Sequence, residues 1–541
     1  MNYRALAAFG ISMALFSVNA HAQNDEDEEE TAEATKSGET KADDGAAKAT
    51  GEVAVGASAD TKTVDANAKA SAEPAPAPAP APEPVPATAG RPPVYGERSE
   101  WAITPYGYAR VDLIEDSTQS FEDGIQPNLI ARVGTYKGDH RRTIFTARDS
   151  RFGIQVNAPT FEGIKSSAQL ELDFYGLAPT DARRHDSVVF GPLRIRHAYL
   201  KMETSVIDVI AGQYYDLFGW NGSFYPATVG YLGVPAQIYH RNPQIRLEKK
   251  IHAGELEVTI AAAAVRPGQR DSGIPDGQGG LKVAYGGWSG AATPGFGRAA
   301  LAPVSVGVSG LYRRFEVPKF RSEPGSATDK TQGYGLAVNL LLPVIPVKDI
   351  KDKGNGLTLT GEFSRGSGIA DMYTFMDGGS RFPLLPNPSM SAPAIQYQAN
   401  VDPGLVTFDR NLELKTLNWQ GFVAGLQYYL PIGGGRIWIS GIYSQIKSDN
   451  IKKLTPFPSY GGIFTKMEYI DGNIGVDLTP AIALGLSFQT VKQTFGDVSP
   501  RDPVFGAVPA NMPNGLVVQG TGGVAASARN NRGQLSLAMF F

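Results

Sequence analysis

The feature that most constrains this chain is a two-residue alternation of apolar and polar side chains, which recurs from Trp101 to the last residue. In residues 534–541 the apolar set is Leu535, Leu537, Met539 and Phe541, and the intervening positions are polar or small. A period of two predicts β-strands with one apolar face. A helical period over more than ten residues is absent from 101–541, so the sequence predicts an all-β fold.

The character of the second face distinguishes two kinds of all-β protein. A soluble sandwich buries its apolar face in a core, whereas a transmembrane barrel turns that face to lipid and its polar face to a water-filled lumen. The chain has no run of 18 apolar residues that could form a membrane helix. Its mean hydropathy of −0.18 fits one lipid face and one water face. These patterns predict a transmembrane antiparallel β-barrel over 101–541.

The alternating runs can be counted as strands. Sixteen are expected, an even number as in bacterial single-chain barrels: 104–113, 147–157, 163–175, 192–203, 207–215, 243–252, 255–265, 279–287, 303–315, 332–342, 356–365, 416–430, 435–447, 465–478, 481–494 and 530–541. The odd-to-even connections are the long ones, as expected for external loops. Connections 288–302 and 343–355 are long for periplasmic turns, which leaves 14 or 18 strands open.

The first hundred residues differ in composition from the rest. Residues 1–22 combine Arg4, a short apolar stretch and the end Ala20-His21-Ala22, a pattern typical of a secretory signal peptide; the alternative is an amphipathic helix of the folded domain. Residues 23–100 are acidic and Ala/Pro-rich, which predicts a disordered periplasmic linker. The linker either tethers the protein to peptidoglycan or is only a solvated leader.

Two further features concern the membrane. A last strand that ends in Phe541 resembles the signal read by the outer-membrane assembly machinery. Tyrosines near strand ends predict aromatic girdles at the lipid interfaces; they are Tyr106, Tyr108, Tyr199, Tyr214, Tyr428, Tyr429, Tyr443 and Tyr469. Both features predict that the protein lies in the outer membrane of a gram-negative bacterium, in contact with outer-membrane lipid.

Several basic residues share the polar phase of their strands: Arg110, Arg151, Arg194, Arg196, Arg246 and Lys282. An arginine in lipid near the midplane costs roughly 2–4 kcal/mol, so these side chains should face the lumen. We expect them to be faced by Glu171, Asp173 and Glu362, which would set up a transverse field that attracts carboxylates or phosphates. The alternative is a lumen whose charges pair internally and serve only hydration and folding.

The charge balance of the predicted barrel bears on these alternatives. Residues 101–541 carry 42 basic and 37 acidic residues, whereas residues 23–100 carry 7 and 17. The basic excess of the barrel modestly favours small anionic solutes.

The connection after strand 207–215 is a candidate constriction. It is rich in glycine and aromatic residues and includes Tyr215, Asp216, Phe218 and Trp220. We expect it to fold into the lumen and set the narrowest point. The alternative is that it packs on a neighbouring protomer or on other loops.

Catalytic and cofactor chemistry has little support in the sequence. The chain lacks cysteine, and His140, His185, His197, His240 and His252 show no metal-ligand spacing. No motif marks a Ser-His or Asp-His pair. We therefore predict no enzyme activity, no cofactor, no metal and no nucleic-acid partner.

Four segments together resemble a known family. Asp149-Ser-Arg-Phe-Gly153, Glu171-Leu-Asp-Phe174, Arg194-Ile-Arg-His-Ala-Tyr199 and Gly212-Gln213 with a following Phe218 are similar, in order and spacing, to the front half of DcaP-like outer-membrane porins. The likeness is clearest over 145–220. It implies a sixteen-stranded homotrimeric porin that passes small anions, notably dicarboxylic acids, with Arg151, Arg194 and Arg196 carrying selectivity.

The leader departs from that family. Its members carry a heptad-patterned periplasmic segment, whereas residues 23–100 show no heptads and many prolines. We therefore do not expect trimerisation through a coiled coil.

The functional expectation is a porin for passive diffusion of small anions, dicarboxylic or other organic acids in particular. The alternatives are a structural or adhesive barrel tethered to the cell wall, a phosphate-selective porin and a general diffusion porin.

Overall fold

The computed structural model describes residues 101–121, 123–124, 129–176, 192–230, 233–319, 327–374, 400–409, 411, 413–454, 464–496 and 525–541. The predicted signal peptide (1–22) and linker (23–100) lie outside these residues, so both stay predictions. Within the described part no helix is long and apolar enough to cross a membrane.

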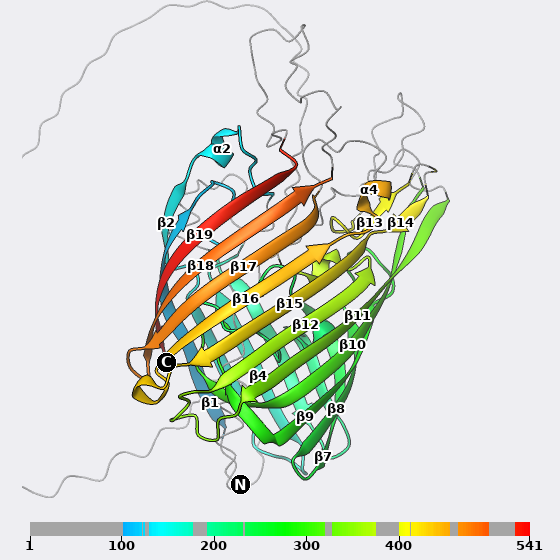
Figure 1. Cartoon of the computed structure of the whole chain (residues 1–541). Coiled ribbons are helices and arrows are strands. Elements are labelled where there is room, and N and C mark those ends of the chain that lie inside the picture. Colours follow the sequence, from blue (N-terminus) through cyan, green and yellow to red (C-terminus); the bar gives the residue numbers. More distant parts are fainter. Residues whose placement is uncertain are drawn as a thin grey trace, which may run out of the picture. The chain divides into compact units, whose positions relative to one another are not determined.

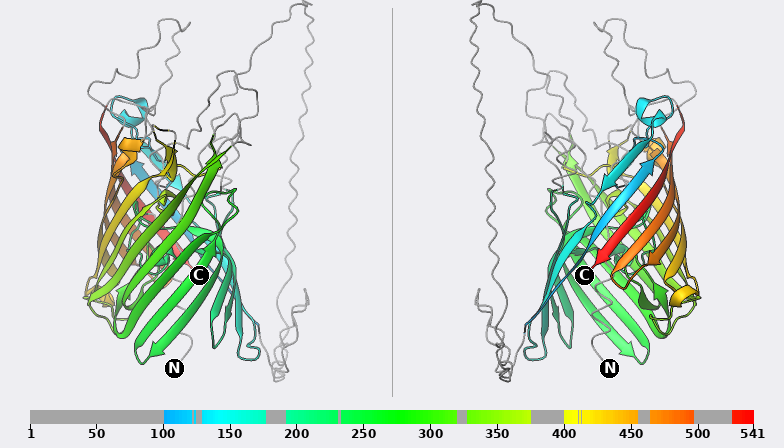
Figure 2. Two further views of the ribbon diagram at one scale, coloured as in Figure 1. Left: turned by 90° about the vertical axis from the view of Figure 1, so that its right-hand side faces the viewer. Right: turned by 90° about the vertical axis from the view of Figure 1, so that its left-hand side faces the viewer.

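Strands dominate the described chain (Figures 1 and 2). The strands are β1 (Ala102–Asp116), β2 (Arg142–Thr146), β3 (Arg151–Asn157), β4 (Lys165–Asp173), β5 (Arg194–Glu203), β6 (Asp208–Tyr215), β7 (Arg241–Ala253), β8 (Leu256–Val265), β9 (Asp276–Ala292), β10 (Ala300–Pro318), β11 (Thr328–Ile345), β12 (Leu357–Ser367), β13 (Val406–Phe408), β14 (Leu414–Thr416), β15 (Asn418–Tyr429), β16 (Ile437–Lys447), β17 (Phe464–Asp477), β18 (Ile482–Phe495) and β19 (Ser527–Phe540). The described helices are short: α2 (Tyr136–Asp139), α4 (Ile451–Leu454), and three 3-10 turns at Phe218–Trp220, Ala370–Met372 and Ile432–Gly434.

The sheet closes on itself through its first and last strands. β1 pairs antiparallel with β19, from Tyr108 opposite Phe540 to Asp116 opposite Arg532. On its other side β1 pairs with both β2 and β3, which occupy one position in the wall. The 17 segments of the sheet therefore make a closed ring of sixteen wall strands among the described residues, as the sequence predicts. The hairpin β13–β14 lies outside this ring.

The alternation sorts side chains between the two faces of the wall. In β19, Leu535, Leu537 and Met539 are 43–54% exposed, whereas Ser536 and Ala538 are at most 1% exposed. Because exposed apolar residues recur around the ring, the outer surface suits lipid and not water. The expected all-β transmembrane barrel is confirmed in its fold.

The structure corrects the lengths of three strands. β9, β10 and β11 extend well beyond their predicted ends, to 17, 19 and 18 residues. The connections predicted as 288–302 and 343–355 therefore shrink to 293–299 and 346–356. No additional hairpin is hidden in either connection.

The predicted aromatic girdle is partly wrong. Tyr106, Tyr108, Tyr429 and Tyr469 are at most 7% exposed and belong to the inner face. Tyr443 does face outward, at 38% exposure. Alternation assigns a residue to a face only when it is known which of the alternate positions point inward. For these tyrosines the prediction used only their position near a strand end, which does not specify the face.

The strands that flank the long connections meet them at one end of the barrel. α2, α4 and the hairpin β13–β14 lie at that end, and the C-terminus lies at the other (Figure 1). Short turns on the periplasmic side and long loops outside are the rule for such barrels. We refer to the two ends as extracellular and periplasmic on that basis.

Candidate functional site

The inner face of β3, β4 and β5 holds a compact cluster of charges. Arg151 begins β3 and lies opposite Asp173 of β4, which lies opposite Arg194 of β5. Arg194 binds Asp173 through two contacts, Nε–Oδ1 at 2.9 Å and Nη2–Oδ2 at 2.5 Å. Arg196 joins the cluster with Nε 2.6 Å from Glu171 Oε1 and Nη1 3.0 Å from Asp173 Oδ2. Four of the residues expected on the lumen wall are thus bound to one another.

A bulge in the wall explains why the cluster is so dense. The register between β4 and β5 shifts between Glu171 and Leu172. Arg196 and the next residue, His197, are consequently both buried, at 0% and 2% exposure, although neighbours on a regular strand would face opposite ways. The predicted inward direction of Arg196 is observed, and the inward direction of His197 was not predicted.

A fourth arginine, absent from the sequence-based set, adds to this cluster. Arg241 begins β7 and places its Cζ 5.9 Å from the ring centre of Tyr215 and 5.7 Å from that of Tyr239. Arg196 Nη2 donates to the hydroxyl of the same Tyr239 at 3.1 Å. Arg151, Arg194, Arg196 and Arg241 therefore share their surroundings with two carboxylates, Glu171 and Asp173. Among the described residues, this cluster combines four arginines with two carboxylates.

The other predicted basic residues lie in different places. Arg110 is bound to Asp112 at 2.9 Å and Asp149 at 3.0 Å, so carboxylates outnumber it. Arg246 binds Glu248 at 2.5 Å. Arg246 Cζ lies 5.3 Å, and Lys282 Nζ 5.5 Å, from the ring centre of Trp220. The predicted set is therefore not one continuous file of guanidinium groups.

Glu362 does not face the arginines as the sequence suggested. It lies on β12 and accepts hydrogen bonds from the backbone N–H of Ile238 at 2.6 Å and from Asn339 Nδ2 at 2.9 Å. Its role in the structure is to hold the connection 216–240.

That connection crosses the interior of the ring. Its backbone N–H groups are bound by side chains from several walls: Phe218 by Gln278 of β9, Gly219 by Ser309 of β10 and Val229 by Asn473 of β17. Ser444 of β16 donates to the carbonyl of Pro235 at 2.5 Å. A backbone segment away from water must find such partners, which accounts for the many amide and hydroxyl side chains on the inner face.

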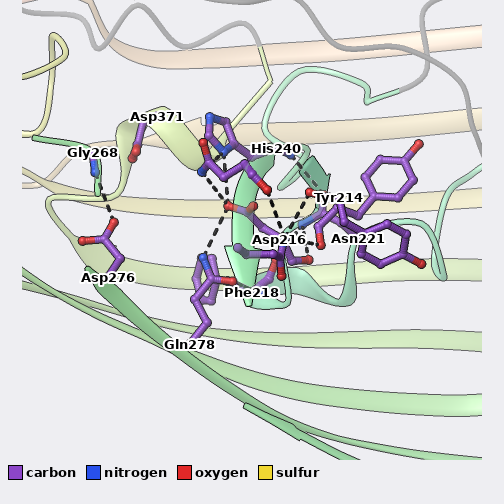
Figure 3. A network of polar contacts seen from close by, with 12 residues as sticks. Tyr214, Asp216, Phe218, Asn221, His240, Gly268, Asp276, Gln278 and Asp371 are labelled. Carbon is purple, nitrogen blue, oxygen red and sulfur yellow. Dashed lines mark hydrogen bonds and ion pairs between the residues drawn. The ribbon is translucent and has the colours of Figure 1, made fainter. Parts of the chain in front are cut away.

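Hydrogen bonds join the two ends of this connection, Asp216 and His240 (Figure 3). The N–H of Asp216 donates to the carbonyl of His240 at 3.1 Å, and His240 Nδ1 lies 3.1 Å from Asp216 Oδ2. Gln278 Nε2 also donates to Asp216 Oδ2, at 3.3 Å. Burial alone would lower the pKa of His240, but the hydrogen bond and charge of Asp216 outweigh burial, so the pKa lies above its usual value.

A periplasmic turn also enters the interior, which the sequence did not predict. In the turn 293–299, Phe296 is 2% exposed and its ring centre lies 5.3 Å from Arg110 Cζ. Arg298 of the turn reaches Asp477 of β17 at 3.3 Å. The unusual length of the connection 288–302 was the one sequence signal that could have drawn attention to this turn.

Water reaches the inner wall unevenly. The inward residues of β16–β19 are covered: Ser444, Asp471, Gln489 and Ser536 are at most 1% exposed. On β5, in contrast, Lys201 and Glu203 have side chains 22% and 42% exposed, and Glu257 of β8 is 31% exposed. The exposed inward residues of β5 therefore lie toward its periplasmic end, whereas the arginine cluster at its extracellular end is covered, with Arg194 8% and Arg196 0% exposed.

Comparisons with known proteins agree with this architecture. No family model and no curated protein sequence matches the chain. Among solved structures, the outer-membrane channel DcaP of Acinetobacter baumannii is similar, with 17% identity, a TM-score of 0.53, and coverage of 82% of this chain and 97% of that one. The anion-selective porin of Comamonas acidovorans (12% identity, TM-score 0.42, coverage 82% and 100%) and OprB of Pseudomonas putida (11%, 0.41, coverage 82% and 94%) are more distant. The likeness to DcaP is one of fold, and the chain therefore has the fold of an outer-membrane channel.

Proposed function

We propose that the protein is an outer-membrane porin through which small anionic solutes diffuse passively. The observation that carries the proposal is the arginine cluster on the wall formed by β3, β4, β5 and β7, where, among the described residues, four arginines meet two carboxylates. Guanidinium groups bind carboxylates and phosphates through paired hydrogen bonds. A cluster rich in arginine therefore favours small anions, dicarboxylates among them.

Two other arginines of the inner face are matched by more carboxylates. Arg313 of β10, like Arg110, is bound by two carboxylates, Asp276 at 2.7 Å and Asp371 at 2.6 Å. The buried carboxyl groups of Glu362 and Asp471 lie on β12 and β17. A positive wall opposite a neutral or negative one produces a transverse field in a narrow, low-dielectric interior, where charges act over longer distances than in water.

The segments inside the barrel supply the second requirement, a narrowed path. The connection 216–240 binds β9, β10, β12, β16 and β17. The turn 293–299 lies against β17 and β18. We propose that solutes pass between these segments and the wall of β3–β8, past Lys201, Tyr199 and the arginine cluster.

Trimerisation is part of the proposal. Outward residues of the short strands β3, β4 and β5 form an apolar face that includes Phe152, Leu170, Ile195 and Leu200, all 44–63% exposed. Such a face can pack against a second copy as well as against lipid. Light scattering of the detergent-solubilised protein distinguishes the two, because a trimer has three times the protein mass of a monomer.

Channel activity is tested with the purified, refolded protein in planar bilayers. We expect stepwise conductance increases, and swelling of liposomes in isotonic dicarboxylate. Heat-modifiable mobility on gels confirms that the barrel has folded. A folded barrel that produces no conductance would favour the adhesive alternative and overturn the proposal.

A further inference from the structure

A row of basic residues follows the outer surface of four neighbouring strands. Lys447 ends β16, Lys466 is near the start of β17, Lys492 is near the end of β18 and Arg529 is near the start of β19. All four therefore lie at the extracellular end of the barrel, where β16–β19 run side by side (Figure 1). We call these four residues the basic row.

The side chains of the basic row face outward. The sequence neighbours Ile446, Met467, Val491 and Ala528 are at most 5% exposed and belong to the inner face. Successive residues of a strand point to opposite faces, so the basic residues point away from the lumen. They are not candidates for pore selectivity.

The register opposes like charges. Lys447 lies directly across from Lys466, and Lys492 lies directly across from Arg529. Like charges in direct cross-strand pairs are destabilising. Two such pairs on adjacent strands indicate that a counter-charge of another molecule balances them.

The protein itself supplies little counter-charge within the described residues. Glu468 is bound to Lys466 at 2.7 Å and also lies directly across from Lys492, so among the described residues one carboxylate accompanies the four basic residues of the row. Two other exposed carboxylates are already engaged: Asp449 with Arg365 at 3.4 Å and Glu115 with Arg141 at 4.0 Å. For Lys447, Lys492 and Arg529 the described part of the chain shows no ion pair.

The height of the row identifies its surroundings. Four residues from Lys466 and Lys492, toward the periplasmic end, lie Ile470 and Phe488, which are 57% and 63% exposed. Four residues of strand span about 13 Å along the strand. The basic row thus lies just outside an apolar band, at the level of the lipid headgroups on the extracellular side.

We infer that the basic row binds the phosphate groups of the anionic glycolipid, lipopolysaccharide, in the outer leaflet. Adjacent strands are about 4.8 Å apart, so the four basic side chains form a strip about 14 Å long, in which Glu468 is the one carboxylate that the described residues supply. Lysine and arginine beside an anionic membrane surface are attracted to its headgroups. The acyl chains of the same lipid would lie on the apolar residues below the row.

The inference is tested with lipid A, the phosphorylated anchor of that glycolipid. The variant combines Lys447→Gln, Lys466→Gln and Lys492→Gln. A matched control combines Lys348→Gln, Lys351→Gln and Arg436→Gln, three exposed basic residues on periplasmic turns. Native mass spectrometry and the shift in melting temperature on adding lipid A in detergent measure binding, and heat-modifiable mobility verifies folding.

We expect the row variant to bind lipid A at least about 10-fold more weakly than the unmodified protein, and the control to bind normally. Dephosphorylated lipid A should bind the unmodified protein as weakly as lipid A binds the row variant. Equal lipid A binding by the row variant and the control would overturn the inference. So would full competition by millimolar inorganic phosphate, because the site would then recognise free phosphate and not the lipid.

Discussion

The backbone N–H of Gly295 donates a hydrogen bond to the carbonyl of Pro226 at 2.9 Å, and the N–H of Thr228 donates to the carbonyl of Gly295 at 3.2 Å. A periplasmic turn and an extracellular connection therefore meet inside the barrel. Neither segment belongs to the wall, and these two hydrogen bonds hold each in place against the other. The position of the connection 216–240 depends on both ends of the barrel.

This contact leads to a prediction about Phe296. Its ring is buried against Val229 of the connection and against β18. Phe296→Ala should release the turn 293–299 and raise the single-channel conductance, because part of the interior becomes accessible to water. Ile432→Ala, on another periplasmic turn and 60% exposed, is the control and should leave conductance unchanged. Unaltered conductance of Phe296→Ala would show that the turn does not limit the path.

A second prediction concerns a glycine on the inner wall. A Cβ on Gly485 would lie 2.7 Å from both Phe296 and Val229, closer than real Cβ contacts. Gly485→Ala should therefore displace the two inner segments or lower the melting temperature. Gly441→Ala has open space around the added Cβ and serves as the matched control. Equal melting temperatures and conductances of the two variants would argue against the close packing described.

The His240–Asp216 pair gives the barrel a pH dependence. Because the pKa of His240 is raised in the folded protein, the pair contributes its full stability below the ordinary histidine pKa of about 6.5 and loses it as pH rises through the raised value. Asp371 also raises the pKa of His240, while Arg313 opposes the effect. Melting temperature should fall from pH 6 to pH 9 by a larger amount in the unmodified protein than in His240→Gln. An equal fall in both proteins would contradict the assignment.

A fourth prediction concerns Glu362. Glu362→Ala leaves the buried N–H of Ile238 without its partner, a loss of about 1–3 kcal/mol. The connection 216–240 should then fluctuate, which single-channel recordings detect as added current noise. Glu413→Ala, at an exposed carboxylate, should record as quietly as the unmodified protein. Quiet recordings from Glu362→Ala would show that this bond does not fix the connection.

The wall of the barrel could be predicted from sequence because alternation is a local signal. In β19 the alternating sequence itself shows which residues face outward, and similar runs elsewhere in the chain give the even number of strands. The inner contacts could not be predicted, because they join residues far apart in sequence. Glu362 and Ile238 are separated by 124 positions, and nothing in either segment specifies the other.

Within the site, the sequence predicted which side chains point inward but not which residues they pair with. The predicted inward direction of Arg194 and Arg196 agrees with their burial, but their pairing with Glu171 and Asp173 depends on a bulge that no local pattern announces. Arg241 was missed because it stands at the edge of its strand, where alternation has not begun. The assembly signal at Phe541 and the peptidoglycan tether stay predictions.

The reversal potential across a salt gradient tests the central claim most directly. In planar bilayers with KCl at different concentrations on the two sides, the unmodified protein should show chloride preference. Arg241→Gln should reduce that preference because it removes one of the four positive charges of the cluster, and Arg365→Gln, on the outer wall and with a side chain 64% exposed, should not. Cation preference in the unmodified protein, or identical reversal potentials for both variants, would contradict the account.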